Sequence, residues 1–158
     1  LQSRGYKVTN LKADMYVNLD AGTIRPAEHG EVFVGEDGIE ADQDLGNYER
    51  FTNQTSTREN YITTGQIYAE VIRRERNLEY GGEDVEVYPD IPKEIIRRIE
   101  ACQKKDDADI IIVEYLTTKE SAYSGKCLNS SRKTSPYIFV NCNDAPSNIE
   151  KIKNNAIL

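Results

Sequence analysis

The sequence lacks the features that mark several protein classes. No apolar run approaches the roughly 20 residues of a membrane-spanning helix, and the opening LQSRGYKVTN does not have the pattern of a secretory signal peptide. The phosphate-binding patterns GxxxxGKS/T and GxGxxG are absent. The single histidine, His29, excludes metal sites that are built from several histidines. We therefore expect no membrane segment and no phosphate loop of the usual kind in these 158 residues.

Positive charge is also scarce. The 20 Lys and Arg residues stand against 27 Asp and Glu residues, which gives a net charge of −7. Nucleic-acid binding without sequence preference needs clustered basic side chains, so we expect no nucleic-acid partner. The three cysteines, Cys102, Cys127 and Cys142, form no CxxC pair, and we interpret them as reduced thiols in a cytoplasmic protein.

What is present is an alternation of strand and helix patterns in a chain long enough for one domain. Strands are expected at 6–11, 31–34, 84–89, 107–114 and 135–142, and helices at 63–75, 91–105 and 147–154. In the first helix, Thr63 or Thr64 is a candidate N-cap, and Ile67, Val71 and Ile72 mark the expected apolar face. The run of four apolar residues at 110–113 is typical of a strand buried in a parallel sheet. The pattern predicts an α/β fold with a largely parallel sheet flanked by helices.

One stretch carries an unusual density of acid. EADQDLGNYERF, residues 40–51, holds four carboxylates within ten positions, with an expected glycine turn at Gly46. A solvated loop explains such a stretch in an acidic chain. A magnesium site also explains it, because Mg²⁺ is held by one or two carboxylates together with phosphate oxygens and water. The residues alone leave both interpretations open.

Several motifs in order resemble one known family. KADMYVNLDAGTIRPAEHGEVFVGEDGIEADQDLGNYERF (residues 12–51), then ITTGQIYAEVIRRER and DADIIIVE, resemble the amidoligase (synthetase) domain of CTP synthases. The likeness runs without large gaps from about Arg4 to Glu114. It implies a P-loop-NTPase-like, Rossmann-type domain in which MgATP phosphorylates UTP and ammonia then displaces the phosphate to give CTP. The ammonia comes from a glutamine amidotransferase domain that we do not find in this sequence.

The resemblance also implies roles for individual residues. Asp44 and Glu114 match magnesium-binding carboxylates, with Asp44 also at the ATP, and Asp42 is a neighbour of that site. Glu114 ends a strand, where open α/β sheets bind ligands. Lys12 matches a lysine that stabilises charge during phosphoryl transfer. His29 matches a histidine that takes part in coupling near UTP and not in proton transfer.

The likeness changes after Glu114. A glycine-rich nucleotide-binding segment is expected there, but the chain continues with residues that resemble a later part of the same domain. We therefore expect one incomplete domain over 1–158, with 1–114 a continuous match and 115–158 joined across a deletion. In the later part, Thr118 and Lys119 remain of a UTP/CTP-binding motif, and Lys151 matches a further nucleotide-binding lysine.

Two functions follow from this likeness. The first is a part of CTP synthase that is inactive or nearly so alone, with UTP, ATP and ammonia as partners and tetramers as the family's assembly. The second is a non-catalytic remnant that associates with intact CTP synthase subunits. A relative of dethiobiotin or cobyrinate synthetases fits less well, because it does not explain HGEVFV or DLGNYERF.

Overall fold

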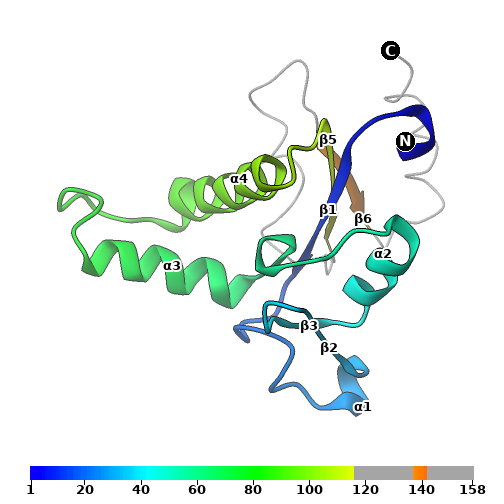
Figure 1. Ribbon diagram of the computed structural model, residues 1–158. Helices are drawn as coiled ribbons and strands as arrows, with labels where there is room; N and C mark the ends of the chain where they lie inside the picture. The colour runs from blue at the N-terminus through cyan, green and yellow to red at the C-terminus, as the bar shows by residue number, and fades with distance from the viewer. Residues whose placement is uncertain (116–136, 142–158) are drawn as a thin grey trace.

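A parallel sheet forms the centre of the molecule (Figure 1). The computed structural model describes residues 1–115 and, as backbone only, 137–141. In this part the sheet has the order β4 (Tyr61–Thr63), β1 (Val8–Asp14), β5 (Ile110–Tyr115), β6 (Tyr137–Asn141), and every neighbouring pair is parallel. The expected parallel α/β architecture is confirmed, including the strand within residues 135–142.

Two long helices cover one face of the sheet. Helices α3 (Thr64–Arg76) and α4 (Val87–Lys105) lie side by side in Figure 1 and contact each other. The core beneath them consists of Leu11, Ile62, Ile67, Val71, Ile91, Ile95, Ile99, Cys102, Ile111 and Val113. Each fully buried aliphatic side chain contributes roughly 1.5–3 kcal/mol, so this layer is the main source of stability. Thr63 is the N-cap of α3, because its hydroxyl accepts the backbone N–H of Gln66 at 3.1 Å.

A smaller unit packs on the opposite face. The antiparallel strands β2 (Val32–Val34) and β3 (Glu40–Asp42) lead into helix α2 (Asp44–Thr52). Their core is Ile39, Ala41, Leu45 and Tyr61, with Tyr16, Phe33 and Tyr48 packed against it. Short helical segments complete the described part: η1 (Gln2–Arg4), α1 (Pro26–His29) and η2 (Arg58–Asn60). Tyr61 and Ile62 are consecutive and lie in different cores, so β4 divides the two layers.

The strand expected at 84–89 is wrong. Val87 already belongs to α4, although Tyr88 keeps an extended backbone at φ −121° and ψ 123°. The alternation of apolar and polar residues at 84–89 suggested a strand with one buried face, but Val87 and Tyr88 are both exposed. No described strand pairs with this segment, and the Asp90 carboxylate accepts the Glu86 N–H at 3.0 Å near the helix start.

Other differences are smaller. The first strand runs from Val8 to Asp14 and not from 6 to 11, because its second half pairs with both β4 and β5. Ile72, expected on the buried face of α3, is 57% exposed. Gly46 lies inside α2, not in a turn. A Cβ there would stand 2.8 Å from the Phe33 ring, so glycine permits the close contact between α2 and β2.

Two further expectations concern a helix near the end of the sequence and the membrane. The helix expected at 147–154 lies outside the described residues. Within the described residues, no helix combines the length and apolar character needed to cross a membrane.

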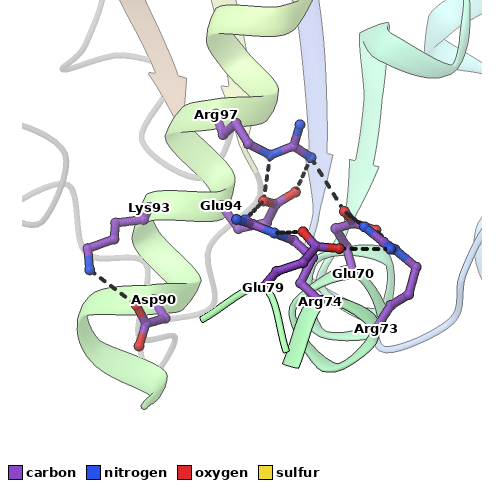
Figure 2. Close-up of polar contacts among 8 residues, drawn as sticks. All are labelled: Glu70, Arg73, Arg74, Glu79, Asp90, Lys93, Glu94 and Arg97. Atoms are coloured by element: carbon purple, nitrogen blue, oxygen red, sulfur yellow. Dashed lines mark hydrogen bonds and ion pairs between the residues drawn. The ribbon is translucent and has the colours of Figure 1, made fainter. Parts of the chain in front are cut away.

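An ion-pair network joins α3 to α4 around a buried carboxylate (Figure 2). The Glu94 side chain is 1% exposed and accepts hydrogen bonds from Arg97 Nε at 2.7 Å and Nη2 at 2.6 Å. Arg74 reaches Glu94 from α3 at 3.5 Å, and Arg73 binds Glu70 with both nitrogens at 2.8 Å. The hydrogen bond with Glu94 raises the pKa of Arg97 above its ordinary value, although partial burial opposes this.

We predict that Arg97→Met lowers the free energy of unfolding by about 2 kcal/mol, because it leaves the Glu94 carboxylate buried with one distant partner. The value lies below that of a fully buried pair because Arg97 is half exposed. Urea denaturation measures it. The control is Lys93→Met on the same helix, which removes the exposed pair with Asp90 and should cost under about 0.5 kcal/mol. Equal losses in the two variants would show that Glu94 does not depend on Arg97.

Candidate active site

The sheet register places Lys12 beside Glu114. Lys12 on β1 is opposite Glu114 on β5 and Tyr61 on β4. Their chain neighbours Leu11, Val113 and Ile62 belong to the core under α3 and α4. Side chains alternate along a strand, so Lys12, Glu114 and Tyr61 project from the other face, toward α2 and the β2–β3 hairpin. Lys12 lies within β1, which extends beyond the range 6–11 expected for this strand.

The acidic stretch is a strand end followed by a helix start. Asp42 closes β3 and Asp44 opens α2. The Asp42 carboxylate accepts the backbone N–H of Asp44 at 2.9 Å, which satisfies one of the free donors at the helix N-terminus. The interpretation of residues 40–51 as a solvated loop is therefore wrong. Asp42 is 9% exposed, and this short turn directs both carboxylates toward β1.

These groups meet around the Lys12 ammonium. Lys12 Nζ lies 2.7 Å from Asp44 Oδ2, 3.4 Å from Glu114 Oε1 and 4.0 Å from Asp42 Oδ2. The Lys12 side chain is only 5% exposed, against 42% for Asp44. Residues 12, 42, 44 and 114 come from separate elements of the fold, and the structure brings all four expected site residues into one cluster.

The cluster fixes the protonation of Lys12. Burial lowers the pKa of its ammonium, but the hydrogen bond with Asp44 and the charges of Glu114, Asp14 and Asp42 raise it further, so the net pKa is raised. Lys12 therefore remains a cation throughout the physiological pH range and is unsuited to act as a general base. For Asp42, burial raises the pKa, and the Asp44 N–H and Lys12 oppose this only in part.

Three participants were not identified from the sequence. Asp14, two residues after Lys12 on the same strand face, accepts the hydroxyls of Tyr16 and Tyr61 at 2.9 Å each. The two tyrosine hydroxyls also contact each other. Burial, followed by the charge of Asp14, raises the pKa of Tyr16, so this phenol stays protonated and donates. The i, i+2 spacing of Lys12 and Asp14 was the signal that could have found this extension of the site.

The donor set fits a hard divalent cation. Carboxylate oxygens are the ligands that Mg²⁺ prefers, and three carboxylates around one lysine leave an excess of negative charge. Within the described residues, no group of three His, Cys, Asp or Glu side chains is arranged to hold a metal by itself. Mg²⁺ usually takes one or two protein carboxylates and fills its shell with water and phosphate oxygens, so two side chains suffice for this ion.

Other expected site residues lie apart from this cluster or outside the description. His29 ends α1, and only its backbone is described. Thr118, Lys119 and Lys151 lie outside the described residues. Of the three cysteines, Cys102 is described. It is a free thiol in the core under α3 and α4, and burial raises its pKa to about 12, so it is not ionised at neutral pH.

Comparison with known proteins gives one consistent result. The sequence model of a family described as "CTP synthase N-terminus" matches residues 1–139. The chain is similar to the CTP synthase of Thermus thermophilus at 52% identity over 114 residues, which cover 72% of this chain and 21% of the relative. It is also similar to the CTP synthases of Pyrococcus horikoshii (50% identity; 84% of this chain, 24% of the relative) and Porphyromonas gingivalis (47%; 90% and 26%). The chain thus spans between about a fifth and a quarter of the length of these curated relatives.

We predict that Asp42→Asn raises the melting temperature at pH 7, whereas Asp44→Asn lowers it. A folded-state pKa above the ordinary 3.8 means that Asp42 favours folding when protonated, and this contribution is lost as pH rises through the raised pKa. The neutral amide removes that cost and still accepts the Asp44 N–H. Asp44→Asn loses the charged hydrogen bond with Lys12, worth about 1 kcal/mol at this partly exposed position.

Thermal unfolding followed by circular dichroism at pH 7 and pH 3 measures both effects. The gain from Asp42→Asn should be a few degrees at most and should shrink at pH 3, where the native carboxyl is itself protonated. A larger loss for Asp42→Asn than for Asp44→Asn at pH 7 would contradict the charge arrangement described above.

Proposed function

This chain belongs to the CTP synthase N-terminus family, and from that premise we propose that it supplies part of the phosphoryl-transfer site for the ATP-dependent amination of UTP to CTP. The relatives are named CTP synthases, and the formation of CTP is an activity of those whole proteins. The contribution proposed for this chain is narrower: Lys12 stabilises negative charge on the phosphoryl group that moves from ATP to UTP, and Asp44 and Glu114 position the ATP phosphates through Mg²⁺.

The observation that carries the proposal is the buried Lys12 ammonium, held at 2.7 Å from Asp44 and 3.4 Å from Glu114. Phosphoryl transfer makes few covalent demands on a protein and depends on positioning and on stabilising spread negative charge. A cation that keeps its proton and is held by carboxylate partners is preorganised for that task. A surface lysine would gain none of these constraints.

Asp44 and Glu114 are the residues we propose to hold Mg²⁺. They come from different elements and both contact the same lysine. When bound, the ion supplies charge neutralisation at the transferring phosphoryl group. Asp42 would then act as a positioning residue, because its carboxylate accepts the Asp44 N–H at the start of α2.

The remaining assignments stay proposals that rest on the family likeness. Thr118, Lys119 and Lys151 are proposed to contact UTP or CTP, and His29 is proposed to take part in coupling ammonia to the reaction. The domain is proposed to be one unit over 1–158, with the later part joined after Glu114. A cytoplasmic location is consistent with the free thiol of Cys102.

A chimera tests the proposal in a working enzyme. We predict that the Thermus thermophilus CTP synthase, with its 114 aligned residues replaced by those of this chain, forms CTP from UTP, ATP and ammonia. In that chimera Lys12→Met should lower kcat by about 10²–10³, the usual loss for one preorganised charge at a transition state. Asp107→Asn is the matched control, because Asp107 pairs with Lys7 at the surface. Unchanged turnover in Lys12→Met, in a chimera that is itself active, would refute the role of the cluster.

The isolated chain should behave differently. We predict that it forms no detectable CTP from UTP, MgATP and ammonia, yet binds Mn²⁺, a paramagnetic substitute for Mg²⁺, with a dissociation constant of about 1 mM or weaker. Broadening of backbone NMR signals near Asp44 and Glu114 would report that binding, and Asp44→Asn should abolish it while Asp107→Asn should not. CTP formation that disappears in Asp44→Ala would contradict the first expectation, and broadening unaffected by Asp44→Asn would contradict the second.

A further inference from the structure

A wide polar groove lies away from the Lys12 cluster. It has a volume of about 660 Å³ and is lined by α3, α4, η2, the turn before β3 and residues 19 and 20. Asp42, Asp44, Glu114 and Lys12 are not among its lining residues. Its basic lining residues are Arg58, Arg73, Arg97 and Arg98. What this groove binds depends on which of those four charges is already neutralised by the fold.

Three of the four arginines have carboxylate partners. Arg97 binds the buried Glu94 with two hydrogen bonds, and Arg73 binds Glu70 in the same way, as Figure 2 shows. Arg58 lies 3.7 Å from the Asp37 carboxylate and also donates to the Asp37 carbonyl at 2.9 Å. The positive charges of these three arginines are therefore already paired with carboxylates of the same chain.

Arg98 differs from the other three. Its Nη2 donates to the Gln66 side-chain oxygen at 3.2 Å and lies 3.5 Å from the Arg58 carbonyl, both neutral acceptors. Among the described residues, no carboxylate oxygen lies within 4.0 Å of it, the distance limit for an ion pair. The guanidinium is also withdrawn from water, and this burial lowers its pKa below the ordinary value. The charges of Glu94, Glu59 and Glu70 oppose this shift only in part. An arginine still carries its charge under these conditions, so a partly buried cation lines the groove and makes no direct ion pair within the described part of the chain.

We propose that the groove is a second ligand site, in which Arg98 binds the phosphate or carboxylate group of a small hydroxylated anion, such as a sugar phosphate. A planar guanidinium suits an oxyanion, because its N–H groups can donate two parallel hydrogen bonds. The rest of the lining suits hydroxyl groups, because Asp20, Glu40 and Glu59 provide oxygen acceptors. The volume is ample for a molecule of that size.

Gln66 holds the site together. Its amide oxygen accepts from Arg98, and its amide nitrogen donates to the Leu19 carbonyl at 2.7 Å. The guanidinium is thereby fixed against the loop that follows β1. A bound anion would replace weak neutral contacts with a charged one, without breaking any ion pair that stabilises α3 against α4.

The test is an NMR titration of the full 158-residue chain with inorganic phosphate, acetate, glucose 6-phosphate and, as an uncharged control, glucose. We expect a saturable shift of the Arg98 Nε–Hε signal with the anions, tighter binding of glucose 6-phosphate than of phosphate, and no shift with glucose. Tighter binding of phosphate than of acetate would identify a phosphate group, and the reverse would identify a carboxylate; both support the site.

Two variants give the decisive comparison. Arg98→Gln should weaken glucose 6-phosphate binding by about tenfold or more, as expected for loss of a charge-assisted contact. Arg73→Gln lines the same groove but removes an arginine already paired with Glu70, and should leave the affinity unchanged. Arg98→Lys, which retains the charge, should bind glucose 6-phosphate with intermediate affinity. Thermal melting of each variant shows whether a loss of binding comes from a folding defect.

The proposal fails if wild-type chain gives no saturable shift up to about 50 mM phosphate or glucose 6-phosphate, a limit that excludes even weak specific binding. It also fails if Arg98→Gln binds as well as wild type. Light scattering covers the remaining case: self-association that Arg98→Gln abolishes and phosphate does not affect would overturn the small-ligand site, because a carboxylate of a second copy would then fill the groove.

Discussion

One buried ammonium organises the functional half of this domain. Lys12 lies on the central strand pair, almost without water, and draws carboxylates from β3, α2 and β5 to within 4.0 Å. Burying a cation alone is very costly, so the fold requires these partners. Asp44, at 2.7 Å from Lys12 Nζ, is the closest of these partners, and its hydrogen bond holds the ammonium in place. Stability and chemical preorganisation thus depend on the same contacts.

The two cores explain how such a polar cluster is tolerated. The aliphatic layer under α3 and α4 provides the main hydrophobic stabilisation, and it uses one face of β1 and β5. The other face of these strands carries Lys12, Asp14 and Glu114. Tyr61, opposite Lys12 on β4, lies beside them in the smaller core. The small unit of β2, β3 and α2 then contributes the acids. A close contact at Gly46, where any side chain would meet Phe33, fixes α2 on that unit.

The arginines of α3 and α4, outside the Lys12 cluster, differ in their partners. Around Glu94, Arg74 of α3 and Arg97 of α4 form ion pairs that join the two helices. Arg98, the next residue along α4, lines the same groove as Arg97, but its hydrogen bonds within the described residues go to neutral acceptors. Neighbouring arginines on one helix therefore serve different ends, because successive residues of a helix point about 100° apart. Sequence alone gives both the same appearance.

The sequence by itself determined the α/β class, the helices at 63–75 and 91–105 and the identity of the cluster residues, because long periodic segments and ordered motifs carry that information locally. It did not reveal α2, misassigned 84–89 as a strand, and left Asp14 and Tyr61 without a role. Those outcomes depend on partners distant in the chain: a strand needs a neighbour to pair with, and Val87 and Tyr88 have none in the described part. Only the tertiary structure decided which acids meet Lys12, since the parallel register of β1 with β5 aligns residues 102 positions apart.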